Sequence, residues 1–566
     1  MNSAPAATLR SKSTEGQRLP WPGVVGLCAV AVTIGYPLFV LLLQSLFPHM
    51  LEASARGFLG PYVQLWHLDR IADMWSNSVM CGLLATIGAW VFGVPAGWIL
   101  ARTDLWGKSI FRVSLLIPVM SPPYLLALAY VLMFQPKGML TVWGIDLPEW
   151  VREGFFSFWG VVLVMALMSI GSVALLVEAA LLGISTRMED AARCLGCPTW
   201  RIFSRITLPL LLPALVNAGI LVFIDAISNF GIAAILSPRA HVALLPQVIY
   251  EWLTSWPPNL AMGAAASTIM AVTAMSLVGL SRKLLALHTV NNGRLPLQRL
   301  MALGRGATVC AWIFFALIFL FSSLLPTGAV FFMSLVKRWE GGHPQFAWDN
   351  YLLICRHGSR GAEALSTSLL LSIGAATICV FIGAVVAYSL ARYRGRLMVL
   401  LDQLSVLPRI VPNIVVAVAI ILAWNVPWIP LPIYGTVNVL LLAYVALYQS
   451  TALRFGDAAM QQITPRLEQA AACLGLPHWR ILWGIVFPML GPSLLIAWIT
   501  ILIRCLRDWV ASIMLLPPGV QTVGSFIFTQ FEQGDFGQAM AMTVCTVVLS
   551  TALLAAANLR LYRKVV

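Results

Sequence analysis

Charged residues are scarce in this chain, and their scarcity excludes most classes of protein. Only 10% of the 566 residues are Asp, Glu, Lys or Arg, whereas 60% are hydrophobic, and the mean hydropathy is +0.86. A soluble domain carries about 25% charged residues. This composition therefore predicts an integral membrane protein that crosses the bilayer many times.

The chain also lacks the motifs of an enzyme. Gly107-Lys108-Ser109 comes nearest to a phosphate-binding loop, but Arg102 stands where the first glycine of that motif belongs. Neither HExxH nor GxSxG occurs. We therefore expect a protein that is not an enzyme, has no catalytic residues and holds no cofactor of its own.

A short charged segment occurs twice between apolar runs. Residues 189–209 read EDAARCLGCPTWRIFSRITLP, and residues 468–488 read EQAAACLGLPHWRILWGIVFP, 279 positions later. In each copy, two alanines make a thin helical face that a partner can approach closely. The glycine permits the left-handed turn that ends a short helix, and the proline prevents its continuation. Each segment is thus predicted to form a helix, a sharp turn and a second helix.

The repeat divides the chain into two similar halves. We expect an all-α membrane protein with about twelve transmembrane helices, six in each half, and with both termini cytoplasmic. Most of the 36 Lys and Arg residues lie in the segments that this topology places inside, as the positive-inside rule requires. The expected parts are a tail (1–20), a first half (21–281, core about 75–281), a linker (282–306) and a second half (307–566, core about 364–560).

Prolines and a polar stretch mark two places inside this plan. Pro118 and Pro122 in the expected third helix recur as Pro408 and Pro412, and prolines survive at membrane depth only where neighbouring groups satisfy the freed carbonyls. The fifth helix is expected at about 209–236. An outer stretch with Arg239, His241, Glu251 and Trp256 should follow it.

Ionisable residues inside apolar spans are the candidates for a translocation pathway. Asp225 and Asn229 share one helical face, and their counterparts in the second half are Arg504 and Asp508, with Arg507 adjacent. A charge in a span is costly, so it is kept for transport or for a structural ion pair. Both alternatives stay open: a pathway, or a pair of Arg504 with Asp508 or Asp225 that holds the halves together. Glu178 and Asp457 correspond near the inner surface and favour a structural or gating contact.

Cys194 and Cys197 form a CxxC pair that could suggest a metal or redox site. The second copy keeps Cys473 but has Leu476 in place of the second cysteine. Because a tetrahedral metal site needs four ligands, we expect no tightly bound metal.

The repeated segment resembles the EAA loop of binding-protein-dependent ABC importer permeases. Together the two halves resemble a fused permease of the ferric-iron type, which is shared by thiamine and phosphonate permeases. Ser228-Asn229-Phe230-Gly231 looks like the acidic-aromatic-glycine segment of that family, and Arg507-Asp508-Trp509 is its second analogue, with Val510 where glycine is expected.

The resemblance implies a partner ATPase and a binding protein. A periplasmic binding protein would deliver the substrate to this inner-membrane chain, two copies of a cytoplasmic ATPase would bind ATP and Mg, and no second permease subunit would be needed. The residues matched to the coupling loops are Glu189, Asp190, Ala191, Ala192 and Gly196, and Glu468, Gln469, Ala470, Ala471 and Gly475. Since Gln469 replaces the usual acid, the two loops are expected to bind the ATPase with unequal strength.

The substrate stays open at this stage. Asp225 and Asp508 would suit a cation such as ferric ion, whereas Arg504 and Arg507 would suit an oxyanion or a phosphonate. Ferric iron is the expectation from the family, with thiamine, phosphonate and polyamine as alternatives. An ion-coupled secondary transporter would also explain the duplication but not the loops.

Overall fold

The computed structural model describes residues 21–48, 57–67, 69–136, 138–184, 186–286, 300–340, 343–426 and 433–565. The predicted tail 1–20 and residues 287–299 of the predicted linker lie outside them. Within the described part the fold is helical apart from one antiparallel hairpin, in which Arg338 pairs with Gln345. The prediction of an all-α membrane protein is confirmed.

The first half contains α1 (Trp21–Val30), η1 (Ala31–Gly35), α2 (Tyr36–Leu46), α3 (Gly60–His67), α4 (Asp69–Arg102), α5 (Lys108–Met120), α6 (Pro123–Phe134), α7 (Met139–Val142), α8 (Glu149–Phe155), α9 (Phe158–Gly183), α10 (Arg187–Cys194), α11 (Thr199–Ile202), η3 (Phe203–Thr207), α12 (Leu208–Ile227), α13 (Phe230–Ala240), α14 (Leu245–Thr254) and α15 (Leu260–Ala286). The segments labelled η are π-helical turns that continue the neighbouring α-helices.

The second half contains α16 (Arg305–Phe319), η4 (Leu320–Leu324), α17 (Leu325–Ser334), β1 (Val336–Glu340), β2 (His343–Phe346), α18 (Asp349–Cys355), α19 (Arg360–Arg392), α20 (Arg396–Ile410), α21 (Asn413–Trp424), α22 (Val437–Met460), α23 (Pro465–Cys473), α24 (His478–Ile481), η5 (Leu482–Val486), α25 (Phe487–Leu506), α26 (Val510–Met514), α27 (Val523–Glu532) and α28 (Phe536–Val565).

Ten of the described helices are long and apolar enough to cross a membrane. Three further helix pairs pass the same test together but are bent by 91° (α5–α6), 88° (α13–α14) and 114° (α20–α21), so the number of spans lies between 10 and 13. The expected twelve falls in this range. Twelve spans result when α5–α6 and α20–α21 each cross as one broken span and α13–α14 re-enters.

Glycines set the closest helix contacts of both halves. Helix α4 packs along α9, and α19 packs along α22 in the same way. A Cβ atom on Gly97 would lie 2.4 Å from the Ala174 carbonyl oxygen, and one on Gly383 would lie 2.6 Å from the Ala452 side chain. Small residues allow such close approach, and the contacts it permits replace the hydrophobic drive that is missing between helices in lipid.

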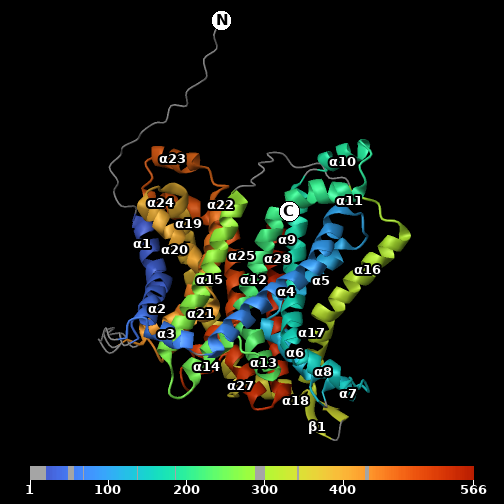
Figure 1. Ribbon diagram of the computed structural model, residues 1–566. Helices are drawn as coiled ribbons and strands as arrows, with labels where there is room; N and C mark the ends of the chain where they lie inside the picture. The colour runs from blue at the N-terminus through green and yellow to red at the C-terminus, as the bar shows by residue number, and fades with distance from the viewer. Residues whose placement is uncertain are drawn as a thin grey trace.

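The leading helix of each half packs on the other half. Figure 1 shows α1 and α2 beside α19, α20 and α21, while α16 and α17 lie beside α5 and α6. Buried hydrogen bonds fix this exchange: the Gln449 amide donates to the Thr33 hydroxyl at 2.9 Å, and the Ser323 hydroxyl donates to the Ser114 carbonyl at 3.3 Å. The two halves of the sequence are therefore not two separate bodies in space.

The expected fifth helix, 209–236, is wrong at its end. Helix α12 stops at Ile227, and the Asn229 side chain accepts the backbone N–H of Ile232 at 3.0 Å, which starts α13 as a new helix. The stretch expected to be an outer connection is largely helical in α13 and α14. An Asn that caps a helix offers the backbone an alternative partner, so it can break an apolar run that contains no proline at that point.

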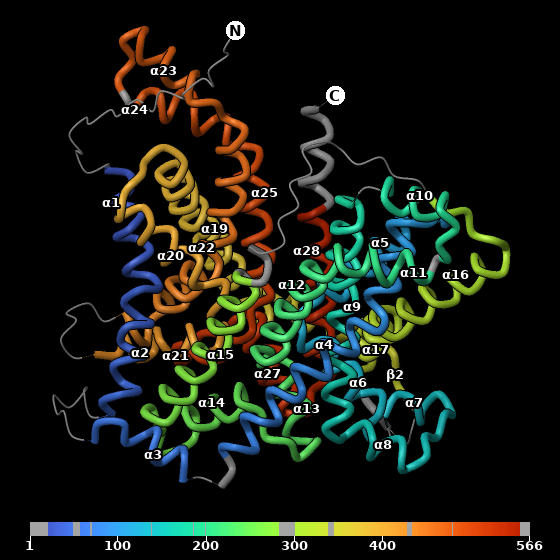
Figure 2. Tube along the Cα trace, turned by 45° about the horizontal axis from the view of Figure 1, so that its top comes forward, coloured from blue at the N-terminus to red at the C-terminus, as the bar shows by residue number. Residues whose placement is uncertain are grey.

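The two repeated loops lie on one side of the molecule. In Figures 1 and 2, α10 and α11 stand at the same end as α23 and α24, and α14 and α27 lie toward the opposite end. The first turn of α1 is at the loop end as well. The fold thus has one face with both loops and an opposite face made of short helices and the hairpin.

Candidate translocation cavity and coupling loops

Four breaks in helices converge at the centre of the fold. The break between α5 and α6 occurs at Ser121-Pro122, and its counterpart between α20 and α21 occurs at Val411-Pro412. The other two separate α12 from α13 and α25 from α26. A proline cannot donate the helical hydrogen bond, so the first two breaks follow from the prolines in the sequence.

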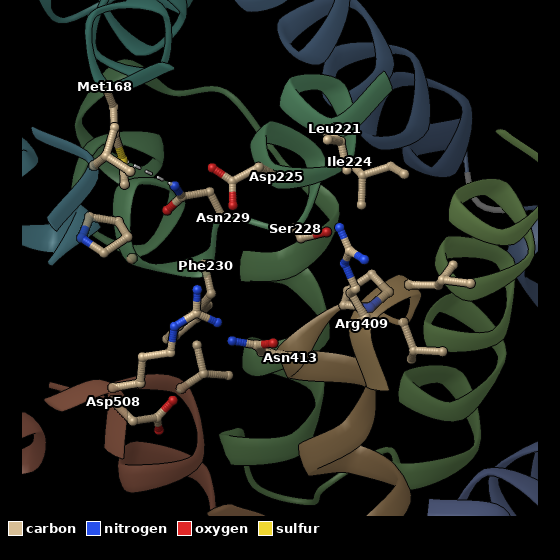
Figure 3. Close-up of a pocket in the computed structure, with 18 of the residues that line it drawn as sticks. Met168, Leu221, Ile224, Asp225, Ser228, Asn229, Phe230, Arg409, Asn413 and Asp508 are labelled. Atoms are coloured by element: carbon tan, nitrogen blue, oxygen red, sulfur yellow. Dashed lines mark hydrogen bonds between the residues drawn. The ribbon is translucent and has the colours of Figure 1, made fainter. Parts of the chain in front are cut away.

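The breaks surround a cavity of about 640 Å³. Its lining includes all five predicted pathway residues, which are Asp225, Asn229, Arg504, Arg507 and Asp508. Figure 3 shows Asp225 and Asn229 on one wall and Asp508 on another, with Arg409 and Asn413 nearby. Residues from the two halves, 279 positions apart in sequence, therefore meet in one cavity.

Asn229 and Asp508 have the same structural role in their halves. The Asp508 carboxylate accepts the backbone N–H groups of Ala511 at 2.9 Å and Ser512 at 3.3 Å, just as Asn229 caps α13. Its other oxygen accepts the Tyr448 hydroxyl at 2.9 Å. Both side chains are buried, and each caps the N-terminus of the helix that follows the break.

The remaining charged groups face the cavity. Asp225 and Arg504 lie in the last turns of the long apolar helices α12 and α25, and they are exposed because the cavity gives them access to solvent. Among the described residues no ion pair within 4.0 Å joins Asp225, Arg504, Arg507 or Asp508 to another charge. The contacts of the structural alternative, an ion pair between the halves, are thus not formed in this conformation.

Sequence reasoning missed several lining residues. Arg409, Asn413 and Asn217 also line the cavity, as do Tyr124, Ser228 and Trp509. The counterpart of Arg409 in the first half is Val119, so comparison of the repeats does not reveal it. The sequence did contain a signal for Arg409, because it stands beside Pro408 within an apolar run. A charge in such a run is costly and therefore marks a functional or structural site.

Buried aromatic rings lie between this cavity and the face opposite the loops. Trp509 stands edge-on to Tyr124 with ring centroids 4.3 Å apart, and it contacts Phe528 of α27 at 5.7 Å. Phe230 contacts Tyr250 of α14 at 5.2 Å. Gly231 packs tightly here, because a Cβ there would lie 3.2 Å from the Tyr124 nitrogen and 3.3 Å from the Trp509 ring. These rings separate the cavity from α14 and α27.

Both loops end their first helix as their glycines predict. Gly196 has φ +75° and Gly475 has φ +79°. In the first loop, Gly196 N–H donates to Arg193 and Cys197 N–H donates to Ala192, and the second loop repeats both hydrogen bonds. This double closure is a Schellman motif, which satisfies the last carbonyls of the helix. No atom lies within 4 Å of a Cβ built on either glycine, so the turns project freely.

The loop glutamates point into the protein. Glu189 is buried and pairs with Arg102 at 3.3 Å, and the Thr207 hydroxyl donates to it at 3.0 Å. Glu468 pairs in the same way with Arg392 at 2.7 Å. Each pair ties the loop to the last residue of a long helix, which is α4 in the first half and α19 in the second. The glutamates therefore connect the loop to the transmembrane helices and are not themselves a docking surface.

Leucine, tryptophan and alanine form the outward faces of the loops. Leu195 and Leu474 are each 83% exposed, and Trp200 and Trp479 are exposed beside them. Only the first alanine of each pair, Ala191 or Ala470, faces outward, because Ala192 and Ala471 are buried. This corrects the expectation that both alanines form the approachable face.

The loops differ in charge at their outer side. Asp190 pairs with Arg193 at 3.0 Å in the first loop, whereas Gln469 and Ala472 occupy these positions in the second. Glu178 pairs with Arg112 at 2.6 Å, whereas the carboxylate of its counterpart Asp457 accepts a hydrogen bond from the Gln461 amide at 3.3 Å. No cluster of three or more metal-binding side chains occurs in the described part of the chain, which includes Cys194 and Cys197.

A family of transport proteins matches both halves of the chain. The family described as binding-protein-dependent transport system inner membrane component matches residues 93–286 and again residues 380–565. Each match contains one repeated loop, and together they contain all five predicted cavity residues.

Relatives match either most of this chain or only part of it. A ferric transport system permease protein of Actinobacillus pleuropneumoniae is 24% identical over 485 residues, which are 84% of this chain and 68% of the relative. An Fe(3+)-transport system permease protein of Haemophilus influenzae is 22% identical over 528 residues, 93% of this chain and 96% of the relative. A molybdenum transport system permease protein of Escherichia coli is 29% identical over 206 residues, only 36% of this chain but 87% of the relative. The chain therefore belongs to the family of binding-protein-dependent transport system inner membrane components, as an ABC importer permease with two permease domains fused in one polypeptide.

Proposed function

We propose that this permease moves ferric iron inward across the bacterial inner membrane. A periplasmic binding protein hands the iron over at the face opposite the loops, and a separate ATPase supplies the energy. The proposal of iron as the substrate rests on the similarity to ferric permeases over 84% and 93% of the chain.

The loops supply a route for the ATPase to act on the cavity. Two ATPase copies dock on the exposed tips around Leu195 and Leu474, one on each loop, and they bind the ATP and Mg. This places the loops and both termini in the cytoplasm. Because Glu189 and Glu468 tie the loops to α4 and α19, a movement of the tips is transmitted to helices that pack beside α12 and α25. These last two helices carry Asp225 and Arg504.

The test is ATP-dependent uptake of labelled ferric iron with the coupling turns changed. Cells expressing this chain with its ATPase and binding protein are compared with cells carrying the double variant Gly196→Leu and Gly475→Leu. A side chain at φ near +75° costs about 1–2 kcal/mol and reshapes the tip. Uptake is expected to fall to background while the variant still inserts, since nothing packs against these glycines.

Two results would contradict the proposal in different ways. Wild-type uptake in the double variant would remove the coupling role of the loops. Absence of iron uptake in an assembled complex that hydrolyses ATP would remove the substrate, and thiamine, phosphonate and polyamine would be tested next. Uptake that follows an ion gradient without ATP would favour a secondary transporter.

A further inference from the structure

The cavity has the charge of an anion site. Three guanidinium groups belong to its lining, those of Arg409 in α20, Arg504 in α25 and Arg507, the residue that follows α25. Against them stand two carboxylates, and that of Asp508 is occupied: one oxygen accepts Tyr448, and the other accepts two backbone N–H groups. Asp225 is the one lining carboxylate of the described residues with no hydrogen bond to the protein. Positive charge therefore exceeds the negative charge that is free to bind a ligand.

Unpartnered donors point the same way. The Tyr124 hydroxyl, the Ser228 hydroxyl and the Trp509 indole N–H are buried and have no hydrogen-bond partner among the described residues. Tyr124 is 1% exposed and Trp509 is 4% exposed, and all three residues line the cavity. A buried donor without a partner costs free energy that a bound acceptor would return. The indole N–H can only donate, and both hydroxyls are able to donate, so all three groups can bind the oxygens of an anion.

A bare ferric ion does not suit this lining. A hard trivalent cation requires several anionic oxygen ligands, and only Asp225 offers one here. Three guanidinium groups would also repel a charge of +3. Guanidinium groups match the geometry of a tetrahedral oxyanion or a carboxylate, which they bind through paired N–H groups.

We infer that the cavity binds an oxyanion through Arg504 and Arg507, and that iron crosses the membrane together with such an anion. The second part rests on the proposed function, since it takes ferric iron as the substrate. The anion covers the positive charge of the metal, and the arginines then attract the complex where they would reject the naked ion. Asp225 lowers the affinity for the anion, so that it can leave.

Binding of labelled inorganic phosphate to the full chain in lipid nanodiscs tests the site directly. Equilibrium dialysis is expected to give saturable binding that Arg504→Gln and Arg507→Gln each weaken by about tenfold or more, because each removes a charge-assisted hydrogen bond. Arg504→Lys keeps the positive charge but loses the paired N–H groups of the guanidinium, so it should weaken binding less than Arg504→Gln does. Arg394→Gln, at an exposed arginine outside the cavity, is the matched control and should bind as the wild type does.

The direction in which Asp225→Asn changes the phosphate affinity distinguishes an anion site from a cation site. Removal of this negative charge should strengthen phosphate binding several-fold if the cavity is an anion site, whereas it would abolish iron binding in a cation site. Since the variant gains affinity, a folding defect cannot imitate the expected result. No saturable phosphate binding to the wild type, or weaker binding by Asp225→Asn, would overturn the inference.

Ferric pyrophosphate labelled in both iron and phosphorus separates the sources of the anion. Both labels bound in a fixed ratio would establish that the metal and anion enter together. Phosphate binding without any iron would keep the oxyanion site and overturn the paired crossing. Iron uptake by cells whose permease shows no anion binding would overturn the inference but leave the proposed function in place. Phosphate binding by a permease that takes up no iron would contradict the proposed iron substrate but would keep the oxyanion site.

Discussion

Asn229 and Asp508 show that a polar residue in a membrane helix can serve the backbone first. Each caps the helix after a break, and each is buried. Their side chains replace the hydrogen bonds that the interrupted helices lose, which is the condition for irregular backbone at membrane depth. Asp225, Arg504 and Arg507 also line the cavity and have no ion pair within 4.0 Å among the described residues, so their charges can act on a substrate.

Substitution at Asp508 should separate capping from charge. Asp508→Asn keeps an acceptor for the α26 N–H groups, so we expect iron uptake near wild type and a small change in stability. Asp508→Ala removes the cap and leaves the Tyr448 hydroxyl unpaired, which should destabilise the protein by about 1–3 kcal/mol. Thermal unfolding in detergent and uptake in cells measure both effects.

Asn229→Asp is the matched control for the cap, because the other half has Asp at this position. It should keep stability near that of the wild type. If Asp508→Asn abolished uptake while its unfolding temperature stayed unchanged, the carboxylate charge itself would act in transport, and capping would not be its main role.

At the scale of elements, ion pairs join each loop to a long helix. The pair of Arg102 with Glu189 is buried, with side chains 4% and 8% exposed. The pair of Arg392 with Glu468 is more exposed, at 14% and 13%. Burial raises the cost of leaving one partner alone. The two loops are therefore attached by equivalent contacts of different strength.

Arg102→Leu should thus be more harmful than Arg392→Leu. We expect the first to destabilise the protein by about 3–5 kcal/mol, since the buried Glu189 carboxylate loses its nearest cation and keeps only the half-exposed Arg193, 3.9 Å away, and the second by less. The double variant Arg102→Leu with Glu189→Leu should recover most of that stability. It should still reduce the ATPase rate that the binding protein stimulates, because the loop has lost its link to α4. Equal destabilisation by the two single variants would contradict this reasoning.

The sequence predicted most elements but not the point at which the fifth expected helix ends. The repeat predicted the loops with their left-handed glycines, whereas Pro122 and Pro412 lay inside expected helices and the breaks beside them were not predicted. The end of α12 at Ile227 was missed, because an apolar run continues to Leu236 and only Asn229 interrupts it. Hydropathy reports that a segment is buried in lipid or protein, and it does not distinguish a crossing helix from a re-entrant one.

The cavity was predicted in part for the same reason. Repeat symmetry placed Asp225 opposite Arg504, and the structure brings both to one lining. Arg409 breaks that symmetry, and the aromatic rings of Tyr124 and Trp509 look like ordinary membrane residues in sequence. Their buried, unpartnered donors become visible only when the helices are assembled.

At the scale of the whole molecule, the exchange of leading helices holds the two halves together. Helices α1 and α2 pack on α19 to α21, and α16 and α17 pack on α5 and α6. The Tyr36 hydroxyl donates to the Ala423 carbonyl at 3.0 Å, and Thr33 and Gln449 share a buried hydrogen bond. Assembly of the halves therefore rests on helix packing within the membrane as well as on the covalent linker.

This arrangement predicts that the chain can be cut without losing the permease. Fragments 1–293 and 294–566, produced together in one cell, should associate because each supplies the leading helix that the other packs against. A purification tag on one fragment should retain the other, and iron uptake should return to a substantial part of the wild-type rate. Co-purification followed by the uptake assay measures both.

Shortening the first fragment distinguishes this packing from general association. A fragment that begins at residue 57 keeps α3 to α15 but lacks α1 and α2, so its partner loses the contacts along α19 to α21. Thr33→Val combined with Gln449→Leu is the milder version, since it removes one buried hydrogen bond and keeps the helix. If the shortened fragment bound its partner as firmly as the intact one does, α1 and α2 would not be what holds the halves together, and the contacts between α15 and α21 or around the cavity would have to supply the affinity.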